Sequence, residues 1–407
     1  MAVVVSALGP RASELSESYS YADYCKDNRE KASEAGRAVF QAKLKEVLAH
    51  NRNNRNNRNT AAAVPKPNSN SWKKGLNAFS HRAAPGPSKG RVAPPEAWLR
   101  ERTAAHRRPA PVEALARAAA GGLPASVDWS AYDTPVKEQG GCGACWAFAS
   151  TQLVESYLAI GTGLRADLSA QQLVACGSND DDCGGFGGCS GSVPELAFSY
   201  LAANTNASGG LLTEWQLGYS SYFGMGNGTQ TFVFNDDALD APLMNVSTCG
   251  YVVPALQQSG AGLLVGVEGF VKLPQNDASA VMAALATVGP LAVNVDASGW
   301  VDYESGVFSG CSYDDMDIDH VVVLVGYGTD EESGEDYWLV RNSWGVTWGE
   351  RGYIRLKRDP VDDTPCGVDD TPQDGTGCFA DRNTPQKPCG QCGVVFDASY
   401  PTGVTAV

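Results

Sequence analysis

The sequence predicts an α+β fold with two subdomains, preceded by an N-terminal extension that is mainly helical. Apolar residues at three- and four-residue spacings from 146 to 160, followed by Gly161, indicate a buried helix. Beyond Gly260 the pattern changes to short β-like runs separated by turn residues, at 291–295, 321–325, 337–341 and 352–356. Helices first and strands second indicate two packed halves.

Charge divides the chain into two unlike parts. Residues 1–123 hold 21 Lys and Arg against 10 Asp and Glu, whereas residues 124–407 hold 10 against 36. The basic front therefore predicts attraction to the acidic remainder of the same chain rather than a nucleic-acid partner. No apolar run approaches the ~18 residues of a membrane span. The apolar start, residues 1–8, lacks a basic n-region, so no clear signal peptide is visible.

The N-terminal extension divides by composition. Residues 12–50 predict a polar helix with one apolar face, and the Arg/Asn run at 51–59 predicts an exposed loop. Residues 84–122 are rich in Pro, Ala, Gly and Arg, which predicts a flexible linker open to proteolysis. We therefore divide the chain into an extension at 1–83, a linker with the processing region at 84–122, and a main domain at 123–407.

Cysteine usage indicates an oxidising compartment. Eleven of the twelve cysteines follow residue 124. Three N-x-[ST] sequons, at Asn206, Asn227 and Asn245, agree with passage through the secretory route and are candidate glycosylation sites. The odd number of cysteines in the acidic part leaves one thiol over if all the others are bridged, and Cys145 is the candidate.

The stretch from Gln139 to Phe148 carries the candidate nucleophile. Cys145 falls in the first turn of the predicted helix, where unpaired N–H groups and the positive end of the macrodipole favour a thiolate. Glycines at 140, 141 and 143 let the backbone approach the sulfur closely. A structural cysteine is the alternative for any one cysteine taken alone.

The pentapeptide Cys142-Gly-Ala-Cys145-Trp146 matches the local signature C-G-[SA]-C-[WY], so the chain resembles the papain/cathepsin cysteine peptidases. Leu123-Pro-Ala-Ser-Val-Asp-Trp129 resembles the start of the mature enzyme, which implies processing near Leu123. Residues 75–79, Gly-Leu-Asn-Ala-Phe, resemble a propeptide segment of this family. The spacing of Phe40, Val47 and Asn51 matches half of the propeptide helix pattern, with a generic amphipathic helix as the alternative. The resemblance implies a papain-like fold, with a helical left half and a β-barrel-like right half, and an inhibitory propeptide.

The second half of the site follows from counting histidines. His50, His81 and His106 precede the proposed cut, so His320 is the only imidazole in the main domain that could act as the base. Asn342, in Arg341-Asn-Ser-Trp-Gly345, resembles the family's asparagine that orients the imidazole, and Trp344 would shield that contact. Gln139 resembles the side-chain donor of the oxyanion hole.

One departure concerns spacing along the chain. His320 and Asn342 lie 175 and 197 residues after Cys145, beyond the usual ~130–150. Insertions near 177–188 and 204–250 absorb the excess, since doubling a loop costs only about 0.6 kcal/mol.

The resemblance implies a cysteine endopeptidase that forms an acyl-enzyme on Cys145, is made as a zymogen and is activated at acidic pH. Its partners would be protein or peptide substrates and its own propeptide, with no cofactor and no metal, and we expect a monomer in the lysosome, vacuole or extracellular space. One exopeptidase branch uses a histidine pair that this chain lacks after residue 124. The alternative is a catalytically silent binding, inhibitor or storage glycoprotein on the same fold.

The substrate pocket is assigned by resemblance alone. The residues that match its backbone-binding segment and walls are Gly191, Val193, Pro194, Asn294, Val321, Trp344 and Asp397. An acid at the pocket floor predicts that Arg or Lys is accepted beside large apolar side chains. A solvated surface aspartate is the alternative for Asp397.

Disulfides also follow from the resemblance, which implies Cys142–Cys189, Cys176–Cys249 and Cys311–Cys392. The pairing of the other four, Cys183, Cys366, Cys378 and Cys389, is left open. Cys389-Gly-Gln-Cys392 could indicate zinc or redox chemistry, although an oxidising compartment favours disulfides. Residues 359–391 form an insertion that is atypical of the family.

Overall fold

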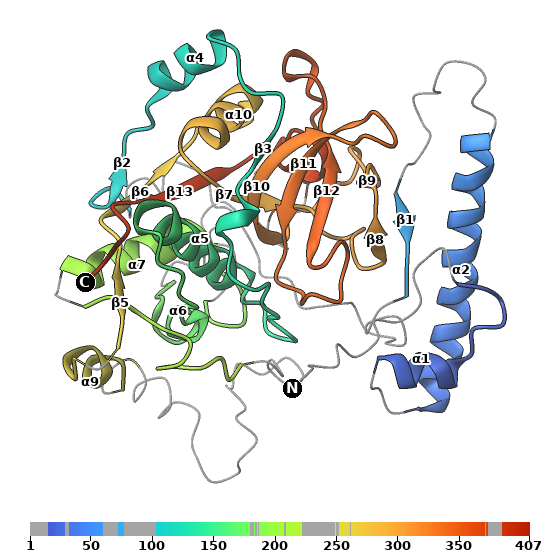
Figure 1. Cartoon of the computed structure of the whole chain (residues 1–407), viewed down its shortest axis with the longest axis horizontal. Helices are drawn as coiled ribbons and strands as arrows, with labels where there is room; N and C mark the ends of the chain where they lie inside the picture. The colour runs from blue at the N-terminus through green and yellow to red at the C-terminus, as the bar shows by residue number, and fades with distance from the viewer. Residues whose placement is uncertain are drawn as a thin grey trace.

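The computed structural model describes residues 15–28, 32–59, 72–76, 103–179, 183, 185, 187–206, 209–221, 249, 252–260, 262–370, 372 and 385–407, without the side chains of 55–59 and 206. It has a helical half and a half dominated by one large sheet, with two further helices from the N-terminus on the far side of the sheet (Figure 1). Within these residues, every helix is too short or too polar to span a bilayer.

The helical half is built on α5 (Cys145–Thr162), whose side chains are almost all buried, so the helix runs through the core. Around it lie α6 (Ala170–Cys176), α7 (Pro194–Asn206) and α9 (Val253–Gln258). A small antiparallel sheet joins β4 (Leu211–Leu212), β5 (Leu264–Gly266) and β14 (Thr405–Ala406). The predicted stop of the long helix at Gly161 was two residues early, because Gly163, with φ 76°, provides the left-handed C-cap.

The other half is a sheet in the order β2-β6-β13-β7-β10-β11-β12-β9, with β3 paired to β10. Neighbours are antiparallel except at β2–β6 and β12–β9. Its strands are β2 (Arg107–Arg108), β3 (Val127–Asp128), β6 (Gly269–Lys272), β7 (Leu291–Val295), β9 (Val307–Phe308), β10 (His320–Thr329), β11 (Asp336–Arg341), β12 (Tyr353–Lys357) and β13 (Ala398–Thr402). All four predicted β-like runs fall on these strands, which confirms the α+β prediction.

Shorter elements complete this half. Helix α10 (Ala278–Thr287) begins behind an aspartate cap at Asp277 and packs beside β10, and α4 (Val112–Ala120) packs on α10. Strand β8 (Tyr303–Ser305) lies outside the large sheet. Three single 3-10 turns cover Ser130–Tyr132, Val361–Asp363 and Gln391–Gly393.

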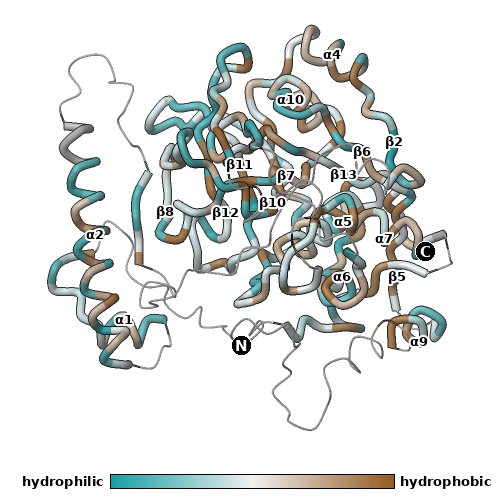
Figure 2. The backbone as a smooth tube through the Cα atoms, turned by 180° about the vertical axis from the view of Figure 1, so that it is seen from behind, coloured by the Kyte–Doolittle hydropathy of each residue, from teal (hydrophilic) through white to brown (hydrophobic). Residues whose placement is uncertain are grey.

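The N-terminal segment, residues 15–59 and 72–76, forms a separate small unit. It contains α1 (Tyr21–Asp27), α2 (Glu34–Asn59) and β1 (Lys73–Lys74), so the predicted single helix at 12–50 is in fact two. The helices share an apolar core that includes Tyr24, Phe40 and Val47. Figures 1 and 2 both place α1 and α2 on the side of the sheet away from α5, α6 and α7.

The predicted exposed loop at 51–59 was wrong, because these residues continue α2 to Asn59. The Arg/Asn run contains neither Pro nor Gly, so the helix propagates through it once started. Asn51 exchanges two hydrogen bonds with the backbone of Lys74, at 2.7 and 3.0 Å, and Asn54 donates to the carbonyl of Trp72 at 2.6 Å. These asparagines therefore hold β1 against α2.

The N-terminal segment docks on the main domain through β1 and α2. Strand β1 pairs antiparallel with β8, and the Gly75 N–H donates to the carbonyl of Asp302 at 2.9 Å. Trp72, only 5% exposed, contacts Phe308 with ring centroids 4.7 Å apart. Lys43 Nζ lies 2.7 Å from the Asp302 carboxylate. Strand pairing, the Trp72 anchor and ion pairing at Asp302 thus fix this segment.

The prediction that residues 84–122 are a flexible linker was wrong for its second part. Residues 103–120, which we call the strap, contain β2 and α4, and both elements pack on the main domain. Composition misled here because one side chain, Leu115, provides most of the apolar burial while alanines allow close packing. Residues 84–102 lie outside the described residues.

Candidate active site

Cys145 is the first residue of α5, and its sulfur is not in a disulfide. The cysteine three residues earlier, Cys142, is bonded to Cys189 with their Cα atoms 4.6 Å apart. The preceding residue, Ala144, provides no side-chain cap for the helix. Because the first N–H groups of a helix have no partner within it, their partial positive charge favours an anionic sulfur on Cys145.

His320 is the first residue of β10 and is fully buried. Its Nε2 lies 2.8 Å from Oδ1 of Asn342. The backbone N–H of Ser343 donates to the same Oδ1 at 2.7 Å, so this atom is an acceptor and the ring must donate through Nε2. Nδ1 is therefore the ring nitrogen that can exchange a proton with a nucleophile.

Hydrogen bonds tie the loop before α5 to the loop after β11. The Gln139 N–H donates to the Ser343 carbonyl at 2.9 Å, and the Ser343 hydroxyl donates to Gln139 Oε1 at 2.6 Å. Gln139 Nε2 donates to the carbonyl of Cys142 at 3.0 Å. Helix α5 also packs against β10. These hydrogen bonds therefore connect the loop directly before Cys145 to Ser343, the residue next to Asn342.

Three buried tryptophans surround the His320 ring. The ring centroids of Trp344 and His320 are 5.0 Å apart, with 33° between the ring planes. Those of Trp300 and His320 are 6.2 Å apart, with the planes at 88°. Trp348 packs on Trp344 with centroids 5.0 Å apart. These indoles exclude water from the His320–Asn342 hydrogen bond, and a hydrogen bond is electrostatically stronger in such surroundings.

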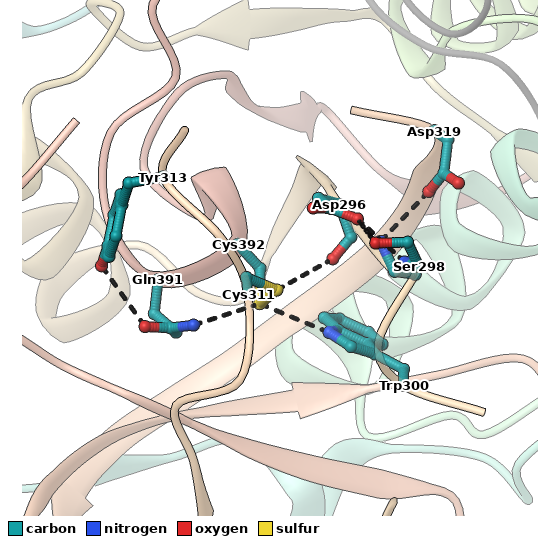
Figure 3. The surroundings of a disulfide bond; sticks show 9 residues. Asp296, Ser298, Trp300, Cys311, Tyr313, Asp319, Gln391 and Cys392 are labelled. Carbon is teal, nitrogen blue, oxygen red and sulfur yellow. Dashed lines mark hydrogen bonds between the residues drawn. A yellow bond between two sulfur atoms is a disulfide. The ribbon is translucent and has the colours of Figure 1, made fainter. Parts of the chain in front are cut away.

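The disulfide between Cys311 and Cys392 stabilises the loop that carries Trp300 (Figure 3). Trp300 donates its indole N–H to Sγ of Cys392 at 3.4 Å, and Cys392 is bonded to Cys311. The 296–298 turn is closed by Asp296 Oδ1, which accepts from the Ser298 backbone N–H at 2.8 Å. This cross-link therefore fixes the indole that lies against His320.

The residues assigned to the substrate pocket lie on several elements. Asn294 of β7 pairs with Val321 of β10, the position next to His320. Gly191 has φ 96°, a conformation that favours glycine, and Val193 is fully buried just before Pro194 opens α7. The structure thus places Asn294 and Val321 beside His320, with Trp344 packed on the ring.

Asp397 lies in a buried charged triad that the sequence reasoning missed. Lys272 Nζ of β6 lies 2.8 Å from the Asp397 carboxylate and 2.9 Å from that of Glu195 in α7, and each side chain is 1% exposed. Burial raises the pKa of Asp397 to about 6, while the two carboxylates raise the pKa of Lys272. Asp397 is therefore not a solvated surface aspartate, because it is buried and pairs with a lysine of its own chain.

The three disulfides that the resemblance implied, Cys142–Cys189, Cys176–Cys249 and Cys311–Cys392, are all present. Two of the four open positions, Cys366 and Cys389, are bonded to each other, and the bond closes a narrow two-stranded arm within the 359–391 insertion. Cys183 is also disulfide-bonded, and Cys378 lies outside the described residues.

The zinc or redox alternative for Cys389-Gly-Gln-Cys392 finds no support, because the two cysteines are bonded to different partners. No group of His, Cys, Asp and Glu within the described ranges could hold a metal ion. Two of the three sequons, at Asn227 and Asn245, lie outside those ranges, and Asn206 ends α7 with its side chain undescribed.

A family model described as "Papain family cysteine protease" matches residues 123–375. The chain belongs to the papain family. Among curated relatives, the cathepsin L-like peptidase of Aedes aegypti is 38% identical over 250 residues, which cover 60% of this chain and 62% of the relative. Cysteine protease 1 of Oryza sativa subsp. japonica is 35% identical over 285 residues, 69% of this chain and 45% of the relative. The chain therefore spans under two thirds of these papain-family relatives.

Solved papain-family structures extend the likeness over the N-terminal segment. The digestive procathepsin L2 proteinase from the Tenebrio molitor larval midgut matches with a TM-score of 0.63 and 26% identity, covering 94% of this chain and 98% of that one. A recombinant stem bromelain precursor matches with a TM-score of 0.59 at 24% identity and 94% of this chain, which is a likeness of fold alone. The papain-like two-subdomain fold with an N-terminal propeptide is thereby confirmed.

Sequence reasoning missed three residues of this papain-family site. Ser343 orients both Asn342 and Gln139, yet a serine after an asparagine carries no signal of that role. Trp300 comes from a loop whose position depends on the Cys311–Cys392 bond. Lys272 stands alone in an apolar strand, and a single buried lysine in such a run could have been noticed because it needs an acidic partner.

Proposed function

We propose that this chain is the zymogen of a cysteine endopeptidase that hydrolyses peptide bonds through an acyl-enzyme on Cys145. The single observation that carries the proposal is the orientation of His320. Its Nε2 is engaged by an Asn342 oxygen that the Ser343 N–H fixes as an acceptor, so Nδ1 is kept for the thiol. A catalytically silent protein has no need of that arrangement.

The proposed reaction has two stages. The Cys145 thiolate attacks the scissile carbonyl, and the C–N bond breaks as the His320 imidazolium protonates the leaving amine through Nδ1. Water then attacks the thioester, giving its proton to His320, and the acid product leaves. The positive ring formed in each cycle is stabilised by the Asn342 acceptor on its other nitrogen.

The oxyanion of each tetrahedral intermediate is assigned to Gln139 and the Cys145 backbone N–H. Gln139 Oε1 accepts from the Ser343 hydroxyl, which fixes which end of the amide faces the site. Its Nε2 gives one of its two hydrogens to the Cys142 carbonyl. The second hydrogen is the proposed oxyanion donor, held in place before substrate arrives.

We assign the N-terminal segment as the inhibitor of the same chain. Its basic residues meet acids of the main domain, as Lys43 and Lys74 do at Asp302. Within the segment, Lys74 lowers the pKa of Glu46, so this pairing is intact at neutral pH and is lost only as pH falls below about 4.5. Protonation of Glu46 therefore weakens pairing within the N-terminal segment late in acidification.

His50 responds earlier in acidification. Burial lowers its pKa, with Lys74 acting in the same direction and Glu46 and Asp302 against it. Because the docked ring resists a proton that the released ring would take, docking weakens as pH falls below about 6.5. Acid should therefore promote release of the segment in two steps.

The test uses an epoxysuccinyl peptide probe that alkylates active-site thiols. We expect acid-treated protein to be labelled at Cys145, and the Cys145→Ala variant to remain unlabelled. Endopeptidase action is measured separately, with an internally quenched peptide that is blocked at both ends. Absence of labelling after the N-terminal segment has been removed would contradict the proposal and favour a silent binding or storage protein.

Substrate preference and location complete the proposal. We assign the pocket to Gly191, Val193, Pro194, Asn294, Val321, Trp344 and Asp397. Since Asp397 already forms an ion pair with Lys272, large apolar side chains should be preferred over Arg or Lys at the second residue before the cleaved bond. We place the enzyme, as a monomer with glycans on Asn206, Asn227 and Asn245, in the lysosome, vacuole or extracellular space.

A further inference from the structure

The strap, residues 103–120, is bound to the main domain differently from the N-terminal segment. Strand β2 extends the edge of the large sheet, and α4 lies beside α10 in both views of the molecule (Figures 1 and 2). We infer that the strap is a permanent part of the catalytic domain, which stays in place after activation and supports the wall of the substrate pocket.

Strand β2 is built into the sheet. Arg107 and Arg108 pair in parallel with Phe270 and Val271 of β6, and the Phe270 N–H donates to the His106 carbonyl at 3.0 Å. The Arg108 side chain donates to the carbonyl of Glu268 at 3.0 Å. The backbone at this Arg-Arg pair is therefore held in a strand, where a protease can reach it only after local unfolding.

The main domain is shaped to receive this strand. At Gly269, the first residue of β6, a Cβ atom would lie 2.3 Å from the His106 carbonyl oxygen. Only a residue without a side chain permits so close an approach of the strap backbone. Thr103, at the start of the strap, is 1% exposed.

Helix α4 adds an apolar anchor. Leu115 is 3% exposed and belongs to the main core, with Ala118 and Ala119 packed against it. Val112, at the start of α4, is 49% exposed, and on the face opposite to Leu115 the side chains of Glu113 and Arg117 form an exposed ion pair. The helix therefore has one face that is part of the core.

These contacts differ in pH response from those of the N-terminal segment. Backbone hydrogen bonds and apolar burial do not titrate, whereas the N-terminal segment carries His50, whose pKa is lowered by burial. Acid that releases the N-terminal segment should thus leave the strap bound. An additional cut in the exposed Gly121-Gly122 turn would leave it as a bound peptide.

The strap also bears on the pocket. Val271, the partner of Arg108, is adjacent to Lys272, which pairs with both Asp397 and Glu195. Loss of β2 would expose the edge of β6 to water directly beside this buried triad. We therefore expect substrate affinity to depend on the strap more than the chemical step does.

The inference rests on the proposed activation, so its test has one arm that needs no activity. Full-length Cys145→Ala protein is treated with pepsin at pH 4.5, purified under native conditions, denatured and analysed by mass spectrometry. We expect residues 103–120 to be recovered in a 1:1 ratio with the main domain while residues 15–59 are lost. Recovery of a folded main domain without the strap would overturn the inference.

The second arm uses active enzyme and a matched pair of variants. Leu115→Asp places a charge in the core and should reduce strap retention at least tenfold and raise KM several-fold, with a smaller effect on kcat. Val112→Asp, at an exposed position of the same helix, should behave as the wild type. Equal retention in both variants, or full activity without the strap, would overturn the inference. Strap retention without probe labelling would instead count against the proposed function alone.

Discussion

Replacing Lys272 with methionine should test the buried triad directly. Lys272, Glu195 and Asp397 form a group of two acids and one base, each side chain 1% exposed. Methionine fills a similar volume but removes the positive charge that lies between the two carboxylates. The two acids would then be buried without a counter-ion unless each takes up a proton.

The size of the effect follows from this burial. Removing one partner from a buried ion pair costs about 3–5 kcal/mol, so we expect a loss of that order in the free energy of unfolding at pH 7. In the wild type, burial already raises the pKa of Asp397 to about 6. An acid with a raised pKa favours the folded state most at low pH, and this advantage is lost as pH rises through the folded pKa. In the variant the pKa of Asp397 rises further because its counter-charge is gone, so the deficit should shrink between pH 7 and pH 4.5.

The assay is urea unfolding followed by tryptophan fluorescence, at both pH values and in the Cys145→Ala background to prevent self-digestion. Lys357→Met is the matched control, because Lys357 pairs with Asp359 at 3.0 Å but its side chain is 40% exposed, so about 0–1 kcal/mol is expected. The triple variant Lys272→Met, Glu195→Gln, Asp397→Asn should recover much of the loss. If Lys272→Met costs no more than Lys357→Met at pH 7, the charge argument is refuted.

Three further outcomes are expected. Asn342→Ala removes the acceptor on the imidazole and should lower kcat about 10- to 150-fold with little change in KM, since hydrogen bonds to charged groups contribute about 1.5–3 kcal/mol; a change in KM alone in peptide assays would speak against it. Asp302→Ala removes the main-domain partner of Lys43 and should speed activation at pH 5 about tenfold, whereas Glu17→Ala, at an exposed pair, should not. His50→Gln keeps an acceptor but cannot titrate, so its activation rate should change less between pH 6.5 and pH 5 than that of the wild type.

The sequence was most informative where chemistry restricts the residue types. Cys145 and His320 could be singled out because a thiol nucleophile needs a base and only one histidine follows the linker, whereas Asn342 was assigned through its resemblance to a family motif. The four strands beyond residue 290 were readable because buried strands need β-branched runs.

The sequence was least informative where structure depends on contacts between distant segments. The strap resembled a linker in composition, because its alanines and arginines do not predict that β2 pairs with the edge of β6. The burial and pairing of Asp397 were not foreseen because its partner, Lys272, is 125 residues away. Composition describes a segment alone, whereas burial depends on what covers it.

The hydrogen bond from the Ser343 hydroxyl to Gln139 joins positions separated by 204 residues. A ribosome-bound chain that has emerged only as far as α5 possesses the sulfur but neither the imidazole nor its support. The proposed active site is therefore complete only when translation has delivered both ends of this bond. The N-terminal segment is synthesised first, so it is already available to dock on β8 when the proposed active site forms.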